Sequence, residues 1–167
     1  MEKLTTIDIT KEALHFSAAH FTIFSATERE RLHGHNFFVS AAVTAVVQPD
    51  GMCFNYSQLK DSLRELCVKL DEYLLLAKDS PYQQISDDGD NYKVRFNNEE
   101  MTFLKADTLL LPVTNITIEE LSHYLLQKLL EDSRYHNNKD IKEITLRVAS
   151  GPGQWGTALW RNDLVSS

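Results

Sequence analysis

Residues 33–47 read HGHNFFVSAAVTAVV, a run rich in aromatic, β-branched and small apolar residues. This composition is typical of a β-strand, and we expect one over residues 37–47 that ends at the turn residues 48–51, Gln-Pro-Asp-Gly. A shorter apolar stretch, LHFSAAH at residues 14–20, comes before it, and the charged and polar segment 22–31 lies between them. We therefore expect two strands joined as a hairpin by a polar loop.

Two later segments have the periodicity of amphipathic helices. The first spans residues 57–70 with Ser57 as its N-cap, and its apolar face is formed by Leu59, Leu63, Leu66, Cys67 and Leu70. The second begins near Thr117, because residues 117–120 (TIEE) fit a capping box. Its apolar face is formed by Ile118, Leu121, Leu125 and Leu129.

The remaining segments read as strands. Residues 92–96 and 101–104 flank Asn-Asn and predict a hairpin inside a β-rich insertion at about residues 78–110. Residues 140–148 and 155–160 are predicted to close the chain as strands. The resulting order is strands, helix, strands, helix, strands. It predicts the α+β class, with two helices packed on one face of an antiparallel sheet.

Composition excludes several classes of protein. The 167 residues fit a single domain over 1–167, and the net charge of −7 argues against binding to nucleic acid or to an anionic membrane surface. No apolar run approaches the roughly 20 residues that cross a bilayer. Cys53 and Cys67 form no disulfide framework, and the N-terminus has no secretory apolar stretch, so we expect a cytoplasmic protein.

Three of the six histidines are close together in the sequence. His33 and His35 stand at positions i and i+2, which share one face of a strand, and a hairpin would bring His20 opposite them. Three imidazole ligands with one open position are typical of catalytic zinc. The alternative is an ordinary exposed strand face. The other histidines have no such setting and read as surface or satisfied residues: His15, His123 and His136.

The segments FSAAH at 16–20 and ERLHGHNF at 30–37 resemble the 6-pyruvoyltetrahydropterin synthase and 6-carboxytetrahydropterin synthase family. Further pieces follow in that family's order over most of the chain: Gly51-Met52, Asn55-Tyr56, Leu59-Lys60, Leu70-Asp71 and Asn115–Glu119. The resemblance implies the tunnelling fold, a four-stranded antiparallel sheet with two helices. It also implies a homo-oligomer, a trimer or a hexamer of two stacked trimers, with the active site between subunits.

The same resemblance implies Zn²⁺ at His20, His33 and His35 and a substrate such as 7,8-dihydroneopterin triphosphate. Zinc would grip the substrate's side-chain hydroxyls and acidify the neighbouring C–H bond. The family's catalytic cysteine would stand where this chain has Arg29, which cannot act as a base. Glu30 forms the pattern E-x-x-H-G-H of a family branch with a glutamate base. It could serve if desolvation raises its pKa, although zinc would oppose that shift. Otherwise Glu30 is one charge of a solvated loop.

Two other family positions differ. The Asp–His proton relay corresponds to Asp71 followed by Glu72, a carboxylate pair that could share a proton or simply be the polar end of a helix. The glutamate that anchors the pterin ring corresponds to Ser150, whose hydroxyl cannot reproduce a bidentate contact. Glu143 or Glu119 could replace it only if the fold brings one there. Thr117 matches the threonine beside the ring.

These observations predict a zinc-dependent pterin synthase or lyase, acting on a carbon–oxygen or carbon–carbon bond. Two alternatives stay open: a related enzyme acting on a non-pterin small molecule, and a non-catalytic zinc-binding paralogue. A triphosphate substrate would also require a local basic patch in this acidic chain, for which the candidates are Arg29, Arg31 and Lys60.

Overall fold

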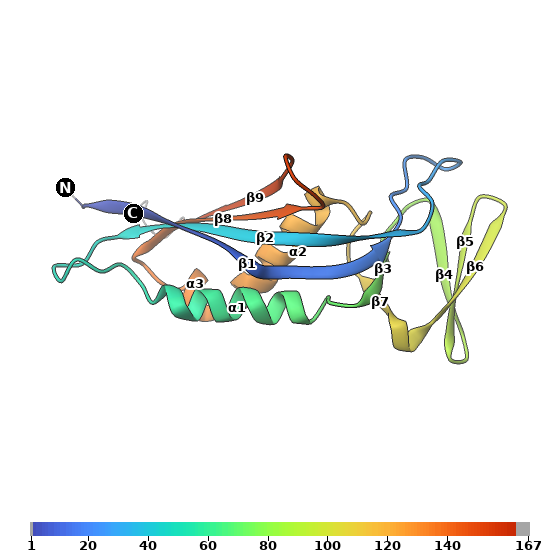
Figure 1. Cartoon of the computed structure of the whole chain (residues 1–167), viewed down its shortest axis with the longest axis horizontal. Coiled ribbons are helices and arrows are strands. Elements are labelled where there is room, and N and C mark those ends of the chain that lie inside the picture. The colour runs from blue at the N-terminus through green and yellow to red at the C-terminus, as the bar shows by residue number, and fades with distance from the viewer. Residues whose placement is uncertain (1, 163–167) are drawn as a thin grey trace.

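The computed structural model describes residues 2–162. Within this range, a large sheet has the strand order β7-β3-β1-β2-β8-β9 and a small sheet has the order β4-β5-β6 (Figure 1). The strands of the large sheet are β1 (Leu4–His20), β2 (His33–Val46), β3 (Tyr73–Ala77), β7 (Thr108–Leu111), β8 (Ile141–Ala149) and β9 (Gly156–Arg161). The small sheet consists of β4 (Gln83–Asp88), β5 (Asn91–Phe96) and β6 (Glu99–Leu104).

The helices lie on one side of the large sheet (Figure 1). They are α1 (Tyr56–Val68), α2 (Ile118–Leu130) and the short α3 (Ser133–His136), and a 3-10 turn, η1 (Lys105–Asp107), leads into β7. None of the helices in the described range is long and apolar enough to cross a membrane.

The long hairpin of β1 and β2 is the predicted strand pair, extended at its far end. Residues 4–10 of β1 pair with residues 40–46 of β2, and the register shifts between Thr10 and His15 before pairing resumes up to His20 opposite His33. Strand β2 begins at His33 rather than at residue 37, because its first residues pair with the end of β1. The histidines therefore lie within the ladder itself.

Both predicted helices are present, but only one of the predicted caps is correct. Asn55, not Ser57, caps α1, because its Oδ1 accepts hydrogen bonds from the backbone amides of Ser57 and Gln58. Thr117 caps α2 as predicted, accepting from the amide of Glu120 at 3.3 Å. The carboxylate of Glu120 does not complete the capping box and instead accepts from the amide of Thr114 at 3.0 Å.

The core lies between the sheet and the helices. Alternate residues of β1, β2 and β8 point toward the helices and are fully buried, and Phe16 and Phe37 stack there with ring centroids 5.1 Å apart. These two phenylalanines face each other across the hairpin, four residues from the paired His20 and His33 on each strand. The packed core thus fixes the hairpin register up to the end where the histidines lie.

The antiparallel prediction holds for β1, β2, β8 and β9 but not for the other edge. Strand β3 pairs in parallel with β1, and β7 pairs in parallel with β3. Neither of these strands was predicted, and both are short, with five and four residues. They extend the sheet toward the small sheet.

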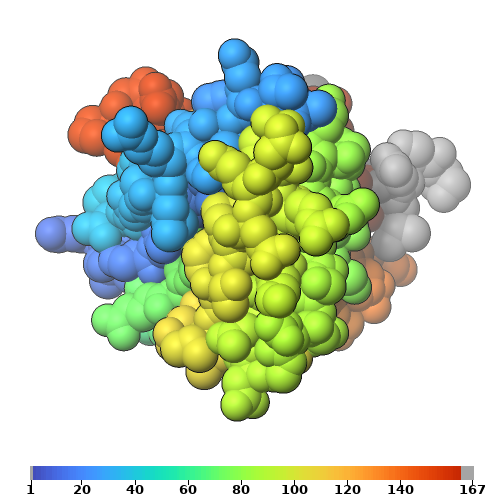
Figure 2. All heavy atoms as spheres, turned by 90° about the vertical axis from the view of Figure 1, so that its right-hand side faces the viewer, coloured from blue at the N-terminus to red at the C-terminus, as the bar shows by residue number. Residues whose placement is uncertain are grey.

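The hairpin predicted near residues 92–104 is confirmed as β5 and β6, with β4 as a third strand. This small sheet covers the end of the molecule, next to the loop that follows β1 (Figure 2). A second apolar cluster joins the loop, β3 and the small sheet, and it consists of Phe21, Ile23, Leu74, Leu76, Val94 and Phe96. The small sheet is therefore packed onto the loop that precedes the histidine pair.

Gly156, the first residue of β9, is in close contact with the first turn of α2. A Cβ atom at this position would lie 2.3 Å from the carbonyl oxygen of Ile118. We expect Gly156→Ala to lower the free energy of unfolding by about 1–3 kcal/mol, because α2 must shift. Urea unfolding checks this, with Gly151→Ala as the control, since its Cβ would meet nothing within 4 Å. Equal stabilities of the two variants would contradict the prediction.

Candidate metal centre

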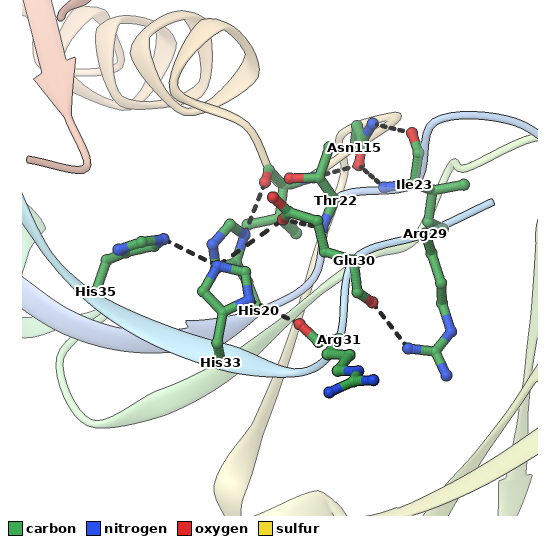
Figure 3. Close-up of polar contacts among 10 residues, drawn as sticks. His20, Thr22, Ile23, Arg29, Glu30, Arg31, His33, His35 and Asn115 are labelled. Carbon is green, nitrogen blue, oxygen red and sulfur yellow. Dashed lines mark hydrogen bonds and ion pairs between the residues drawn. The ribbon is translucent and has the colours of Figure 1, made fainter.

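The hairpin brings three imidazoles together. His20 is the last residue of β1 and is paired with His33, while His35 lies two residues further along the same face of β2. One nitrogen from each ring lies within 4.8 Å of the others (Figure 3). His20 is buried, and the other two are partly exposed. The three histidines singled out by the sequence thus form one cluster that could hold a metal ion.

Backbone carbonyls fix the tautomers of two of the rings. The Nδ1 of His20 lies 2.9 Å from the carbonyl oxygen of Ile116, and the Nδ1 of His33 lies 2.7 Å from that of Arg31. A carbonyl oxygen can only accept, so the neutral rings carry their protons on Nδ1. Their Nε2 lone pairs are then free to act as ligands.

The Nε2 atoms are poorly satisfied by the protein alone. Among the described residues, the buried Nε2 of His20 has no hydrogen-bond partner. The Nε2 atoms of His33 and His35 are 2.9 Å apart. An unpaired buried polar atom is costly, and a cation bound at this position would remove that cost at His20. The donor set therefore fits a metal ion that prefers nitrogen ligands.

The surroundings of His20 and His35 also favour the neutral form of these rings, which is the form that binds a metal. Burial lowers the pKa of His20 below its usual value, and the neighbouring His33 and His35 lower it further, against the hydrogen bond to Ile116. Burial is also the main cause that lowers the pKa of His35, with His33 adding to it. Neutral imidazoles are what a metal requires.

Glu30 lies beside the cluster (Figure 3). Its Oε2 accepts a hydrogen bond from the amide of Thr22 at 3.0 Å and lies 3.8 Å from the Nε2 of His33. Burial pushes the pKa of Glu30 upward, but the Thr22 hydrogen bonds and the nearby histidines outweigh it, so the pKa is lowered. The rise in pKa considered from the sequence is thus wrong. The group is therefore a carboxylate at neutral pH, the form that can accept a proton, but the lowered pKa makes it a weaker base than an ordinary glutamate.

Arg29 points away from the histidines. Its Nε and Nη2 donate to Glu99 at 2.8 and 2.6 Å, and its Nη1 donates to the carbonyl oxygen of Glu30 at 2.9 Å. Of the three residues proposed for a basic patch, Arg29 is therefore already paired with an acid.

Asn115 holds the loop in place and was not singled out by the sequence. Its Oδ1 accepts from the amide of Ile23 at 3.1 Å, and its Nδ2 donates to the carbonyl of the same residue at 2.7 Å. The partners are 92 residues apart, so the only signal in the sequence was the position of Asn115 within the family-like stretch 115–119.

Asp71 and Glu72 lie just before β3, which pairs with the edge of β1 opposite to β2. Asp71 Oδ1 accepts from the amide of Ser17 at 2.7 Å, and the amide of Glu72, which has a φ of 64°, donates to the carbonyl of Ser17. No hydrogen bond or ion pair within residues 2–162 connects either carboxylate with the three histidines. Glu72 and His35 do line the same hollow, of about 500 Å³.

The predicted substrate residues lie at one end of α2 and β8. Thr117 directly follows Ile116, whose carbonyl binds His20. Ser150 is partly buried and directly follows β8. Glu143 cannot replace it within this chain, because seven residues of extended strand, about 23 Å, separate the two positions. Glu119 is exposed in the first turn of α2.

The remaining histidines and cysteines have the structural settings expected of them. His15 and His136 bind backbone carbonyls of Glu12 and Leu130, and His123 is exposed. Burial raises the pKa of Cys67 to about 12, so this thiol is a core side chain and not a nucleophile.

Known proteins share this sequence pattern and this fold. A provisionally named 6-carboxy-5,6,7,8-tetrahydropterin synthase of Methanocaldococcus jannaschii is 26% identical over 144 residues, covering 84% of this chain and 86% of that protein. The crystal structure of 6-pyruvoyl tetrahydropterin synthase from Plasmodium vivax is 29% identical, with a TM-score of 0.90 and coverage of 96% and 99%. The Plasmodium falciparum enzyme is 28% identical, with a TM-score of 0.89 and coverage of 95% and 98%.

Two further structures of the Plasmodium vivax enzyme are described as mutants of a catalytic residue, a glutamate replaced by alanine or by cysteine. The fold shared with these enzymes confirms the expected α+β tunnelling fold. The sequence profile described as 6-pyruvoyl tetrahydropterin synthase matches residues 8–159, and this chain belongs to that family.

Proposed function

We propose that this protein is a zinc-dependent pterin synthase or lyase acting on 7,8-dihydroneopterin triphosphate or a related pterin. One observation carries the proposal: three imidazoles converge beside a carboxylate, Glu30, whose Oε2 lies 3.8 Å from the Nε2 of His33. Membership in a family of pterin synthases supports the substrate class. The acid–base chemistry would involve a C–H bond next to the substrate's hydroxyl groups.

His20, His33 and His35 would hold the zinc ion, since three nitrogen ligands with an open position are typical of catalytic zinc. Bound zinc would polarise the hydroxyls of the substrate and make the neighbouring C–H bond more acidic. The carbonyls of Ile116 and Arg31 would keep two of the rings in the ligating tautomer.

Glu30 would take the proton. Its pKa is lowered, so the carboxylate is ionised at neutral pH, and the Thr22 amide holds Oε2 on the side of the histidines. A catalytic glutamate in the Plasmodium vivax enzyme, which is 28% identical in its variant structures, supports this role. Arg29 stays paired with Glu99 and leaves the carboxylate of Glu30 available.

Asp71 and Glu72 would return the proton, in the position of the family's relay. Within one chain, Glu72 lines the same hollow as His35, whereas Asp71 is not among the residues that line it. We therefore propose that the working site forms between subunits of a homo-oligomer, a trimer or a hexamer. A second copy would then supply the relay carboxylates. The free thiols of Cys53 and Cys67 are consistent with a cytoplasmic location.

A second candidate function follows from Ser150. A serine cannot make the charge-assisted bidentate contact that holds the pyrimidine edge of a pterin, and Glu143 is too far along β8 to replace it. The ligand of the same centre would then be another small molecule. Calorimetry with a set of pterins and purines distinguishes the two candidates, since tight binding of a pterin supports the first.

The metal proposal predicts one zinc ion per chain in the purified protein. We expect His33→Ala to retain less than about a tenth of it, because two imidazoles alone bind zinc weakly. Elemental analysis after dialysis measures the zinc content. His123→Ala is the matched control, since that exposed histidine lies on α2. Equal zinc in both variants would contradict the assignment.

The role of Glu30 predicts a catalytic defect without loss of metal. We expect Glu30→Gln to lower kcat on 7,8-dihydroneopterin triphosphate at least about 100-fold, since the amide cannot accept the proton. Glu28→Gln, an exposed carboxylate of the same loop, should keep the wild-type rate. Full activity of Glu30→Gln would exclude the role, and a wild-type protein without turnover on any pterin would exclude the function.

The position of Ser150 predicts a gain of binding. If this residue faces the pyrimidine edge, Ser150→Glu should tighten the binding of 7,8-dihydroneopterin about tenfold or more, because charged hydrogen bonds contribute about 1.5–3 kcal/mol. Ser150→Gln, which has the same shape without the charge, should gain less. Calorimetry measures both. Unchanged or weaker binding in Ser150→Glu would place the ring elsewhere.

A further inference from the structure

Arg29 occupies a pocket between the loop and the small sheet. Its guanidinium carbon lies 5.3 Å from the ring centre of Phe21 and 5.9 Å from that of Phe96. Only 18% of its side chain is exposed, whereas 55% of the side chain of its partner Glu99 is exposed. The guanidinium is thus largely withdrawn from water and held by the two rings and by its hydrogen bonds.

The hydrogen bonds of Arg29 run in two directions. Two nitrogens donate to Glu99, the first residue of β6, and the third donates to the backbone carbonyl of Glu30. One side chain therefore connects the small sheet to the residue that carries the proposed base. Only the planar fork of arginine offers three donors in this fixed geometry.

The Glu30 backbone is then fixed on both sides. Its amide donates to the carbonyl of Thr22 at 2.8 Å, and its carbonyl accepts from Arg29. The carboxylate is set by a third bond, from the amide of Thr22 at 3.0 Å. A side chain that must lie within hydrogen-bond reach of a reacting atom benefits from such a fixed backbone.

Glu99 has a further effect on this arrangement. Its carboxylate takes two of the arginine donors, so the cation next to Glu30 is already paired. Without Glu99, the guanidinium would be free to turn toward the carboxylate of Glu30 and compete for it. The small sheet thus both holds the arginine and keeps it away from the base.

We propose that Arg29 is a positioning residue for Glu30, and that Phe96 and Glu99 of the small sheet hold it in that role. The small sheet is then part of the catalytic site rather than an appended unit. This inference rests on the proposed function of Glu30, but its structural part, the fixing of residues 22–30 by Arg29, can be measured without turnover.

The test compares Arg29→Gln, Glu99→Gln and the double variant with a matched control pair. Arg95 and Glu100 form an exposed ion pair at 3.5 Å on the same small sheet, so Arg95→Gln and Glu100→Gln serve as controls. We expect the Arg29 and Glu99 variants to lower kcat about 10–100-fold, with KM and zinc content within about twofold of wild type. The double variant should be no worse than the poorer single variant, because both act through one contact.

Hydrogen exchange provides the second measurement. We expect the peptide covering residues 21–31 to exchange at least about tenfold faster in Arg29→Gln than in the wild type, and Arg95→Gln to leave it unchanged. Arg29→Lys, which keeps the charge but not the fork, should fall between the two in both measurements. If Arg29→Gln loses its thermal unfolding transition, Arg29→Lys against Arg95→Lys decides the question.

Several results would overturn the inference. These are an unchanged kcat in Arg29→Gln, a fall in kcat that follows a loss of zinc, equal losses in the control pair, or unchanged exchange in residues 21–31. If the wild-type protein itself turns over no pterin, the proposed function fails. Faster exchange in Arg29→Gln alone would then still support the fixing of the loop by Arg29.

Discussion

The pairing of His20 with His33 across the β1–β2 hairpin is the constraint on which the site depends. Side chains alternate along a strand, so a slip of one residue would turn His33 and His35 to the opposite face from His20. The stacked Phe16 and Phe37 hold the register from the core side. The burial that stabilises this packing also removes water from the Nε2 of His20, which leaves an atom suited to a metal.

The carboxylate of Glu30 shows how opposing effects are balanced at such a site. Burial alone would raise its pKa, yet the amide of Thr22 and the neighbouring imidazoles keep it ionised. Its position depends on the loop, and the loop is held by Asn115 before α2 and by the second apolar cluster under the small sheet. The carboxylate of Glu30 is therefore placed by three segments that are far apart in the sequence.

The sequence predicted the features that depend on neighbouring residues and missed those that depend on partners far away in the chain. The alternation of residues 33–47, the HGH pair and the TIEE cap are local, and the structure has the strand, the cluster and the cap. The N-cap of α1 was predicted at Ser57, two residues after the actual cap, Asn55. The direction of β3 and the Arg29–Glu99 pair, 70 residues apart, required the tertiary structure.

Zinc K-edge X-ray absorption of the metal-loaded protein tests the central claim most directly. A centre built from His20, His33 and His35 predicts three imidazole nitrogens at about 2.0–2.1 Å and a further oxygen ligand at the open position. Addition of 7,8-dihydroneopterin should change the oxygen shell and leave the nitrogen shell intact. A sulfur ligand at about 2.3 Å, or a first shell without imidazole nitrogens, would contradict the claim.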